Sequence, residues 1–166
     1  MPCNCIVDKP TYPQNEEWGP LVWLILHTLA EKAGRQTNML TLGDEQRAWP
    51  LFVKALPPVI PCPYCREHLQ EYLNTNPFVL PGDYYAWKEY IPLYFYTLHE
   101  SVNRRLGKPS FPQSSLASTY GSTGPLQPTL TRLETIQMRA IKMGGVSLLA
   151  WKAWLKQYNM LRAAIL

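Results

Sequence analysis

The most informative stretch of this sequence is residues 61–73, which read PCPYCREHLQEYL. Two of the chain's four cysteines, Cys62 and Cys65, stand here as a CxxC motif, followed by residues with the pattern of a helix. A CxxC at a helix N-terminus favours the thiolate, because unpaired N–H groups and the positive end of the helix dipole stabilise a negative sulfur. Arg66 and His68 add positive or polarisable neighbours. The motif therefore indicates a reversible dithiol/disulfide pair, although C-x2-C is as typical of half a zinc site.

Outside this motif, the chain also has the pattern of helices and lacks convincing strands. Apolar residues recur every three to four positions, and there is no good run of alternating or β-branched residues. Asp44 is expected to cap the second helix, and Pro92 to kink or break the fourth. The pattern predicts an all-α protein in which four helices form a core bundle and additional C-terminal helices follow. The expected helices cover about residues 17–33, 44–56, 63–73, 84–106, 129–143 and 146–164.

The chain divides into four parts by composition. Residues 1–15 hold Cys3 and Cys5 and three prolines, and we expect a flexible N-terminal arm with a CxC motif. Residues 16–112 form the predicted bundle, and residues 113–128, rich in Ser, Pro, Gly and Thr, are expected to be a linker. Residues 129–166 form a C-terminal helical extension. Its last helix is amphipathic, and packing on the core or on a dimer mate is favoured over membrane binding.

Bulk composition narrows the function classes. The 166 residues carry a net charge of +4 with scattered Lys and Arg, so no dedicated nucleic-acid surface is expected. No stretch has the length and apolarity of a membrane span, and no secretory signal is recognisable, so we expect a non-secretory protein. Four cysteines in such a setting favour catalysis or metal binding over structural bridges. The 16 prolines and six tryptophans predict short helices and an aromatic core.

Three segments together resemble one family. Residues 18–30 read WGPLVWLILHTLA, residues 61–65 read PCPYC, and residues 98–111 read LHESVNRRLGKPSF. In this order and spacing they resemble the Erv/ALR sulfhydryl oxidases, whose motifs are LGRxTWxxLHTLA, PCxxC and LHNxVNxxLGKPxF. The resemblance covers about residues 17–111, and the WGPxxW form is similar to the versions encoded by large DNA viruses.

This resemblance implies an activity and a setting. Family members bind FAD in the core of a small four-helix bundle and oxidise thiols of client proteins to disulfides, with O2 as acceptor and H2O2 as product. It also implies a homodimer. For a viral member the expected location is the infected-cell cytoplasm or the virion, and for a cellular member the mitochondrial intermembrane space.

The resemblance also implies roles for individual residues. Cys65 would be the flavin-proximal cysteine and Cys62 the interchange cysteine that meets the incoming thiol. Cys3 and Cys5 would be a shuttle disulfide between client and active site. No metal site is implied. The residues expected to bind FAD are Gly19, Trp23, His27, His99, Val102, Asn103, Arg105, Lys108 and Phe111.

Departures from the family pattern leave other functions open. Pro20 stands in place of a family arginine, Glu100 in place of an asparagine, and the cysteines of a common structural bridge are both absent. One alternative is a zinc-stabilised helical interaction module that pools all four cysteines. Another is a helical scaffold that binds partners through its C-terminal helices, although the intact CxxC argues against it.

Overall fold

The computed structural model describes residues 12–166, so Cys3 and Cys5 and the first eleven positions of the expected arm lie outside the described residues. All regular structure in the described part is helical, which confirms the all-α prediction. None of its helices is both long and apolar enough for a membrane crossing. The long helices are α1 (Asn15–Glu31), α2 (Met39–Lys54), α3 (Pro63–Thr75), α4 (Trp87–Arg105), α6 (Gln127–Lys142) and α7 (Leu148–Ile165).

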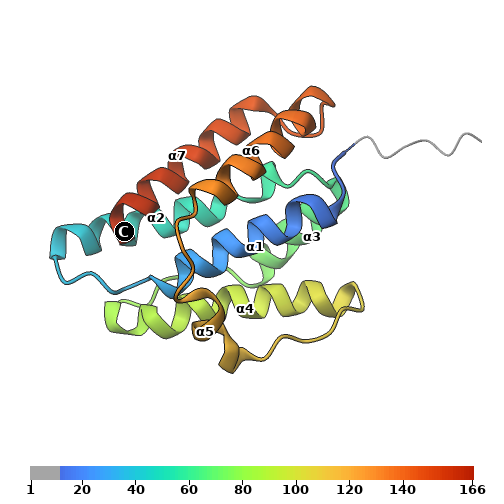
Figure 1. Cartoon of the computed structure of the whole chain (residues 1–166). Coiled ribbons are helices and arrows are strands. Elements are labelled where there is room, and N and C mark those ends of the chain that lie inside the picture. The colour runs from blue at the N-terminus through green and yellow to red at the C-terminus, as the bar shows by residue number, and fades with distance from the viewer. Residues whose placement is uncertain (1–11) are drawn as a thin grey trace, which may run out of the picture.

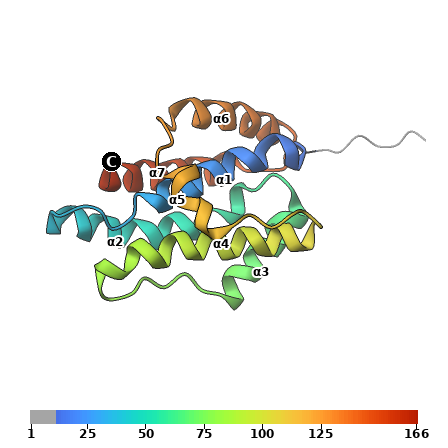
Figure 2. The same ribbon diagram turned by 60° about the horizontal axis from the view of Figure 1, so that its bottom comes forward.

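Helix α1 lies in the middle of the molecule, between α4 on one side and α6 on the other (Figures 1 and 2). Helix α7 packs along α2, and the two helices share an aromatic layer. In this layer the Trp154 and Phe52 ring centroids are 5.6 Å apart, and Trp49 lies 5.9 Å from Phe95 of α4. The C-terminal helices therefore complete the core of the bundle, and burial of these large rings supplies much of its hydrophobic stabilisation.

The start of α2 differs from the expectation. Asn38, not Asp44, is the N-cap, and its side chain accepts a hydrogen bond from the Leu40 N–H at 2.9 Å. The Asn38 cap and burial of Leu42 outweigh the cost of about 1 kcal/mol for Gly43 within the helix. Asp44 instead pairs with Arg47 on the surface.

Two other segments also depart from the expected pattern. The predicted fourth helix begins as a short 3-10 turn, η2 (Tyr84–Ala86), and α4 then runs without a break through Pro92. The expected linker begins with η3 (Gln113–Ser115) and α5 (Leu116–Tyr120), and α5 packs against α1. Burial of Leu116 holds this short helix in place. One further 3-10 turn, η1 (Pro57–Val59), connects α2 to the CxxC motif.

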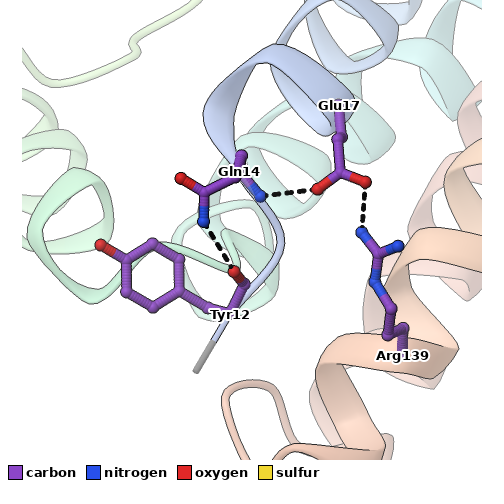
Figure 3. A network of polar contacts seen from close by, with 4 residues as sticks. All are labelled: Tyr12, Gln14, Glu17 and Arg139. Carbon is purple, nitrogen blue, oxygen red and sulfur yellow. Dashed lines mark hydrogen bonds and ion pairs between the residues drawn. The ribbon is translucent and has the colours of Figure 1, made fainter. Parts of the chain in front are cut away.

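A polar network fixes the beginning of α1 to α6 (Figure 3). The Glu17 carboxylate accepts the backbone N–H of Gln14 at 2.8 Å and pairs with Arg139 at 2.5 Å. The hydrogen bond from Arg139 is the main cause that lowers the pKa of Glu17. Gln14 in turn donates to the Tyr12 carbonyl at 3.1 Å. This network stands at the start of α1, whose first residue, Asn15, contacts Cys65 of the CxxC motif.

Candidate functional site: a dithiol beside a cavity

The CxxC motif begins α3 as the sequence predicted. Cys62 is the N-cap residue, Pro63 takes the first helical position, and the Cys65 N–H donates to Cys62 Sγ at 3.2 Å. Proline is favoured there because that position has no intrahelical N–H partner to lose. The two sulfurs have different surroundings. Cys62 is only 4% exposed and belongs to the apolar core, whereas Cys65 is half-buried and faces a cavity.

The surroundings of Cys65 differ from the expected thiolate site. Burial, followed by the Cys62 thiol, raises the pKa of Cys65 to about 11. Two groups act in the opposite direction: Asn15, whose Nδ2 donates to the sulfur at 3.4 Å, and the positive charge of Arg105. In the dithiol form, burial and the neighbouring thiol therefore oppose the thiolate stabilisation expected at a helix N-terminus.

The two expected cationic neighbours have other partners. The Arg66 guanidinium donates to the Ile60 carbonyl at 2.8 Å and to the Gly145 carbonyl at 2.5 Å. The His68 ring packs edge-on against Tyr64, with centroids 4.2 Å apart. Arg66 is thus engaged by backbone carbonyls, whereas His68 lines the same cavity as Cys65.

The cavity beside Cys65 has a volume of about 840 Å³. Its walls come from α1, α3, α4 and α5, together with the residues that follow α4. Its size lies in the range of small-molecule and cofactor sites. The sequence-predicted residues that line it are Gly19, Trp23, Cys65, His99, Val102, Asn103, Arg105 and Lys108.

A stack of rings crosses the interior at this cavity. Trp23 of α1 lies flat on His99 of α4, with centroids 3.9 Å apart and planes at 7°. His27 approaches His99, with Nε2 and Nδ1 2.9 Å apart, and it stacks on Tyr120 of α5 at 4.7 Å. Burial lowers the pKa of His27 to about 3 and that of His99 to about 4. Both imidazoles are neutral near pH 7, so one ring donates its N–H to the other.

Three predicted residues do not line the cavity. Cys62 is covered, and His27 lies behind His99, which it contacts. Phe111 lies beyond the end of α4, where its N–H donates to the Glu100 carboxylate at 3.0 Å. Glu100, noted as a departure from the family pattern, also accepts from Asn103 at 3.1 Å and from Ser110 at 2.5 Å. This carboxylate thus organises the turn that carries Lys108.

Three residues at the site were not predicted from the sequence. Asn15 contacts the Cys65 sulfur although it lies 50 residues earlier in the chain, and no local sequence pattern predicts such a contact. Trp18 lines the cavity, and its buried indole N–H has no hydrogen-bond partner among the described residues. Tyr120 closes the ring stack from the segment expected to be a linker. Of these three residues, only Trp18 had a signal in the sequence, namely the apolar periodicity of the helix around it.

Metal binding has no support in the described part of the chain. Residues 12–166 contain no cluster of three or more His, Cys, Asp or Glu side chains that could hold a metal ion. Cys3 and Cys5, which a zinc site would need, lie outside the described residues.

The fold and site together define a class of protein: a helical bundle in which a dithiol opens onto a cofactor-sized, ring-lined cavity. A family model narrows this class, since the model for the Erv1 / Alr family matches residues 20–121, which exceeds half of the chain. The chain belongs to this family, which confirms the resemblance inferred from the three motifs. No solved structure matches the chain.

Named relatives come from plants and from a virus. The chain is 29% identical over 108 residues to FAD-linked sulfhydryl oxidase ERV1 of Oryza sativa subsp. japonica, covering 64% of this chain and 50% of that protein. It is 30% identical to ERV1 of Arabidopsis thaliana, over 69% of this chain and 56% of that protein. An FAD-linked sulfhydryl oxidase of African swine fever virus (isolate Pig/Kenya/KEN-50/1950) is 31% identical, over 62% of this chain and 79% of that protein. The matched region thus spans about half the length of the plant relatives.

Proposed function

We propose that this protein is an FAD-dependent sulfhydryl oxidase that forms disulfide bonds in client proteins and delivers the electrons to O2. One observation carries the proposal: the sulfur of Cys65 faces the same cavity as the Trp23–His99 stack and Lys108. The relatives' names point to the same activity. The chemistry that FAD supplies when bound is two-electron transfer from the dithiol to O2, with H2O2 as product.

The residues at the cavity fit such a cofactor. Trp23 and His99 offer flat faces against which a planar ring system can stack. Lys108 and Arg105 line the cavity and offer positive charge to a pyrophosphate. The unpartnered N–H of Trp18 is available to a polar atom of a bound group. We assign FAD binding to these residues and to Gly19, Val102 and Asn103, whereas His27 would act by holding His99.

The dithiol would react by exchange. A client thiolate attacks Cys62 of the Cys62–Cys65 disulfide, so a client–Cys62 bond forms while the Cys62–Cys65 bond breaks and leaves its electron pair on Cys65. The Asn15 N–H and the Arg105 charge lie where they would stabilise that leaving thiolate. A second client thiolate then displaces Cys62, which releases the client disulfide and leaves the reduced pair.

The proposal also assigns a role to Cys3 and Cys5 and an oligomeric state to the protein. Cys3 and Cys5 would relay electrons from client to Cys62. If so, the Cys3→Ser/Cys5→Ser variant keeps turnover of a small dithiol and slows a protein client, whereas equal rates on the client would remove the relay. The homodimer implied by the family is also proposed, and light scattering of the full chain tests it.

A visible absorption spectrum of the purified protein tests the function most directly. We expect bound-flavin absorption that bleaches when dithiothreitol is added under air and recovers as oxygen is consumed. A colourless protein that contains zinc would overturn the proposal and make Cys62 and Cys65 metal ligands.

A further inference from the structure

Cys62 is poorly placed for the exchange that the proposed function requires. An attacking sulfur must approach the disulfide from outside, yet Cys62 is 4% exposed and does not line the cavity. Cys65, which faces the cavity, is the more accessible of the two sulfurs. Part of the protein must therefore move before a client thiol reaches Cys62.

The turn between α6 and α7 lies against the residue that precedes Cys62. Gly144, with φ +77°, ends α6, and the N–H of Gly145 reaches back to the Ala140 carbonyl at 2.9 Å. This is a Schellman-type end, which glycine permits because it has no Cβ. A Cβ added at Gly145 would lie 3.7 Å from the Pro61 carbonyl oxygen. The turn is therefore in close contact with the active-site segment.

Two side chains join this turn and α6 to the residues before Cys62. The Arg66 guanidinium spans the gap, donating to the Gly145 carbonyl at 2.5 Å and to the Ile60 carbonyl at 2.8 Å. Gln137 of α6, which is 1% exposed, donates its amide N–H to the Val59 carbonyl at 2.7 Å. The Val59 carbonyl is thus held by α6, the Ile60 carbonyl is joined to the α6–α7 turn through Arg66 of α3, and the Pro61 carbonyl lies against that turn.

We propose that the α6–α7 turn is a cover over Cys62 which selects the thiols that this site oxidises, with Arg66 and Gln137 as its positioning residues. The inference rests on the proposed function and deepens it. Small dithiols need only a brief opening of the cover, whereas a thiol carried on a folded or bulky chain needs the turn displaced. The cover lies outside residues 20–121, the part of the chain that the family model matches.

Alkylation of Cys62 by iodoacetamide tests the cover without any need for flavin or oxygen. In this reaction the thiolate sulfur displaces iodide, forming an S–C bond. The full-length protein is reduced under anaerobic conditions, and the Cys62 rate is read by peptide mass spectrometry beside that of Cys65. Gln137→Leu removes the donor to Val59, and Arg66→Lys keeps the charge but cannot bridge both carbonyls. Each variant should raise the Cys62 rate about tenfold, the effect of losing one buried hydrogen bond on an opening equilibrium.

Glu134→Gln, on the exposed face of α6, is the matched control and should leave the Cys62 rate unchanged. The urea-unfolded chain gives the rate of an uncovered thiol. Wild-type Cys62 that reacts as fast as in the unfolded chain would overturn the cover. The cover would also be overturned if Gln137→Leu and Arg66→Lys left the Cys62 rate unchanged while thermal melts showed both variants to be folded.

The rate of oxidase turnover then tests whether the cover selects between small and protein thiols. The probes are dithiothreitol and reduced ribonuclease A, and the background is Cys3→Ser/Cys5→Ser, so that both thiols must react at Cys62 directly. In this background Gln137→Leu and Arg66→Lys should raise kcat/KM for the protein thiol more than for the small dithiol. An equal change for both probes would refute selection. Absence of any oxidase turnover would refute the proposed function alone, because the alkylation result stands apart from it.

Discussion

Helices α3 and α7 have opposite characters. Helix α3 carries the redox motif but has no fully buried residue along its length. Helix α7 carries no recognisable chemistry, yet it buries six residues, including Trp151, Trp154 and Tyr158. The dithiol therefore sits on a helix at the edge of the bundle, and its geometry depends on polar contacts with neighbouring segments. The stability of the fold depends on the helix that follows the family match.

This contrast separates two classes of substitution. Changes around α3 should alter chemistry with small effects on folding, because little apolar surface is at stake there. Changes in the α2–α7 aromatic layer should alter folding first.

The largest effect is expected from Cys65→Ser. The substitution removes the sulfur that faces the cavity and keeps the side chain's size, so all oxidase turnover should be lost while the protein stays folded. Oxygen consumption with dithiothreitol, flavin absorbance and a thermal melt report the three properties. Retained turnover would sink the assignment of Cys65, and a large loss of stability would contradict the proposed separation.

The opposite result is expected from Trp154→Ala. This ring is 1% exposed and packs between Trp151 and Tyr158 and against Phe52, so its loss should cost about 3–5 kcal/mol in the free energy of unfolding. Leu69→Ala on α3 is the comparison, and should cost about 1 kcal/mol because Leu69 is half-buried. Urea denaturation measures both, and equal losses would remove the contrast between the two helices.

The sequence predicted α3 well because its signals are local. Pro63 at the first helical position and the CxxC before it define the start without reference to the rest of the molecule. Lys108 and His99 were placed at the cavity by the order of family motifs. By contrast, the contact of Asn15 with Cys65 joins distant positions, and α5 depends on burial of Leu116 in a segment of turn-like composition. The sequence also did not predict that α7 packs on α2, because an amphipathic pattern shows which face of a helix is buried but not which helix covers it.

The histidine pair should make stability depend on pH. Burial lowers the pKa of His27 to about 3 from the ordinary histidine value of 6.5, so the unfolded chain binds a proton at a higher pH than the folded chain does. Stability from this group is fully present above about pH 6.5 and falls as the pH falls toward 3. Between pH 6.5 and pH 5 the free energy of unfolding lost through His27 should be about 1.6 kcal/mol.

Two carboxyl groups act in the opposite sense in part of this window. Burial raises the pKa of Glu31 and of Glu45, so their contributions weaken as the pH rises. The measurement is therefore the difference between wild type and His27→Gln in urea denaturation across the window. A difference that does not change with pH would show that His27 is protonated alike in both states.

The smallest effect is expected from Asn15→Leu. Asn15 begins α1 and touches Cys65, and the Glu17–Arg139 pair fixes this end of α1 to the C-terminal part of the chain (Figure 3). Removal of the amide should raise the pKa of Cys65 still further and slow reduction of the disulfide about fivefold, the worth of one modest hydrogen bond to a leaving thiolate. Rapid-mixing kinetics with dithiothreitol and the ultraviolet thiolate titration give the two values. Asn159→Leu, an equivalent change at an exposed position of α7, should alter neither. If both variants slow reduction equally, the chemistry at α3 is not set by its polar neighbours, and packing of the whole bundle would have to account for it.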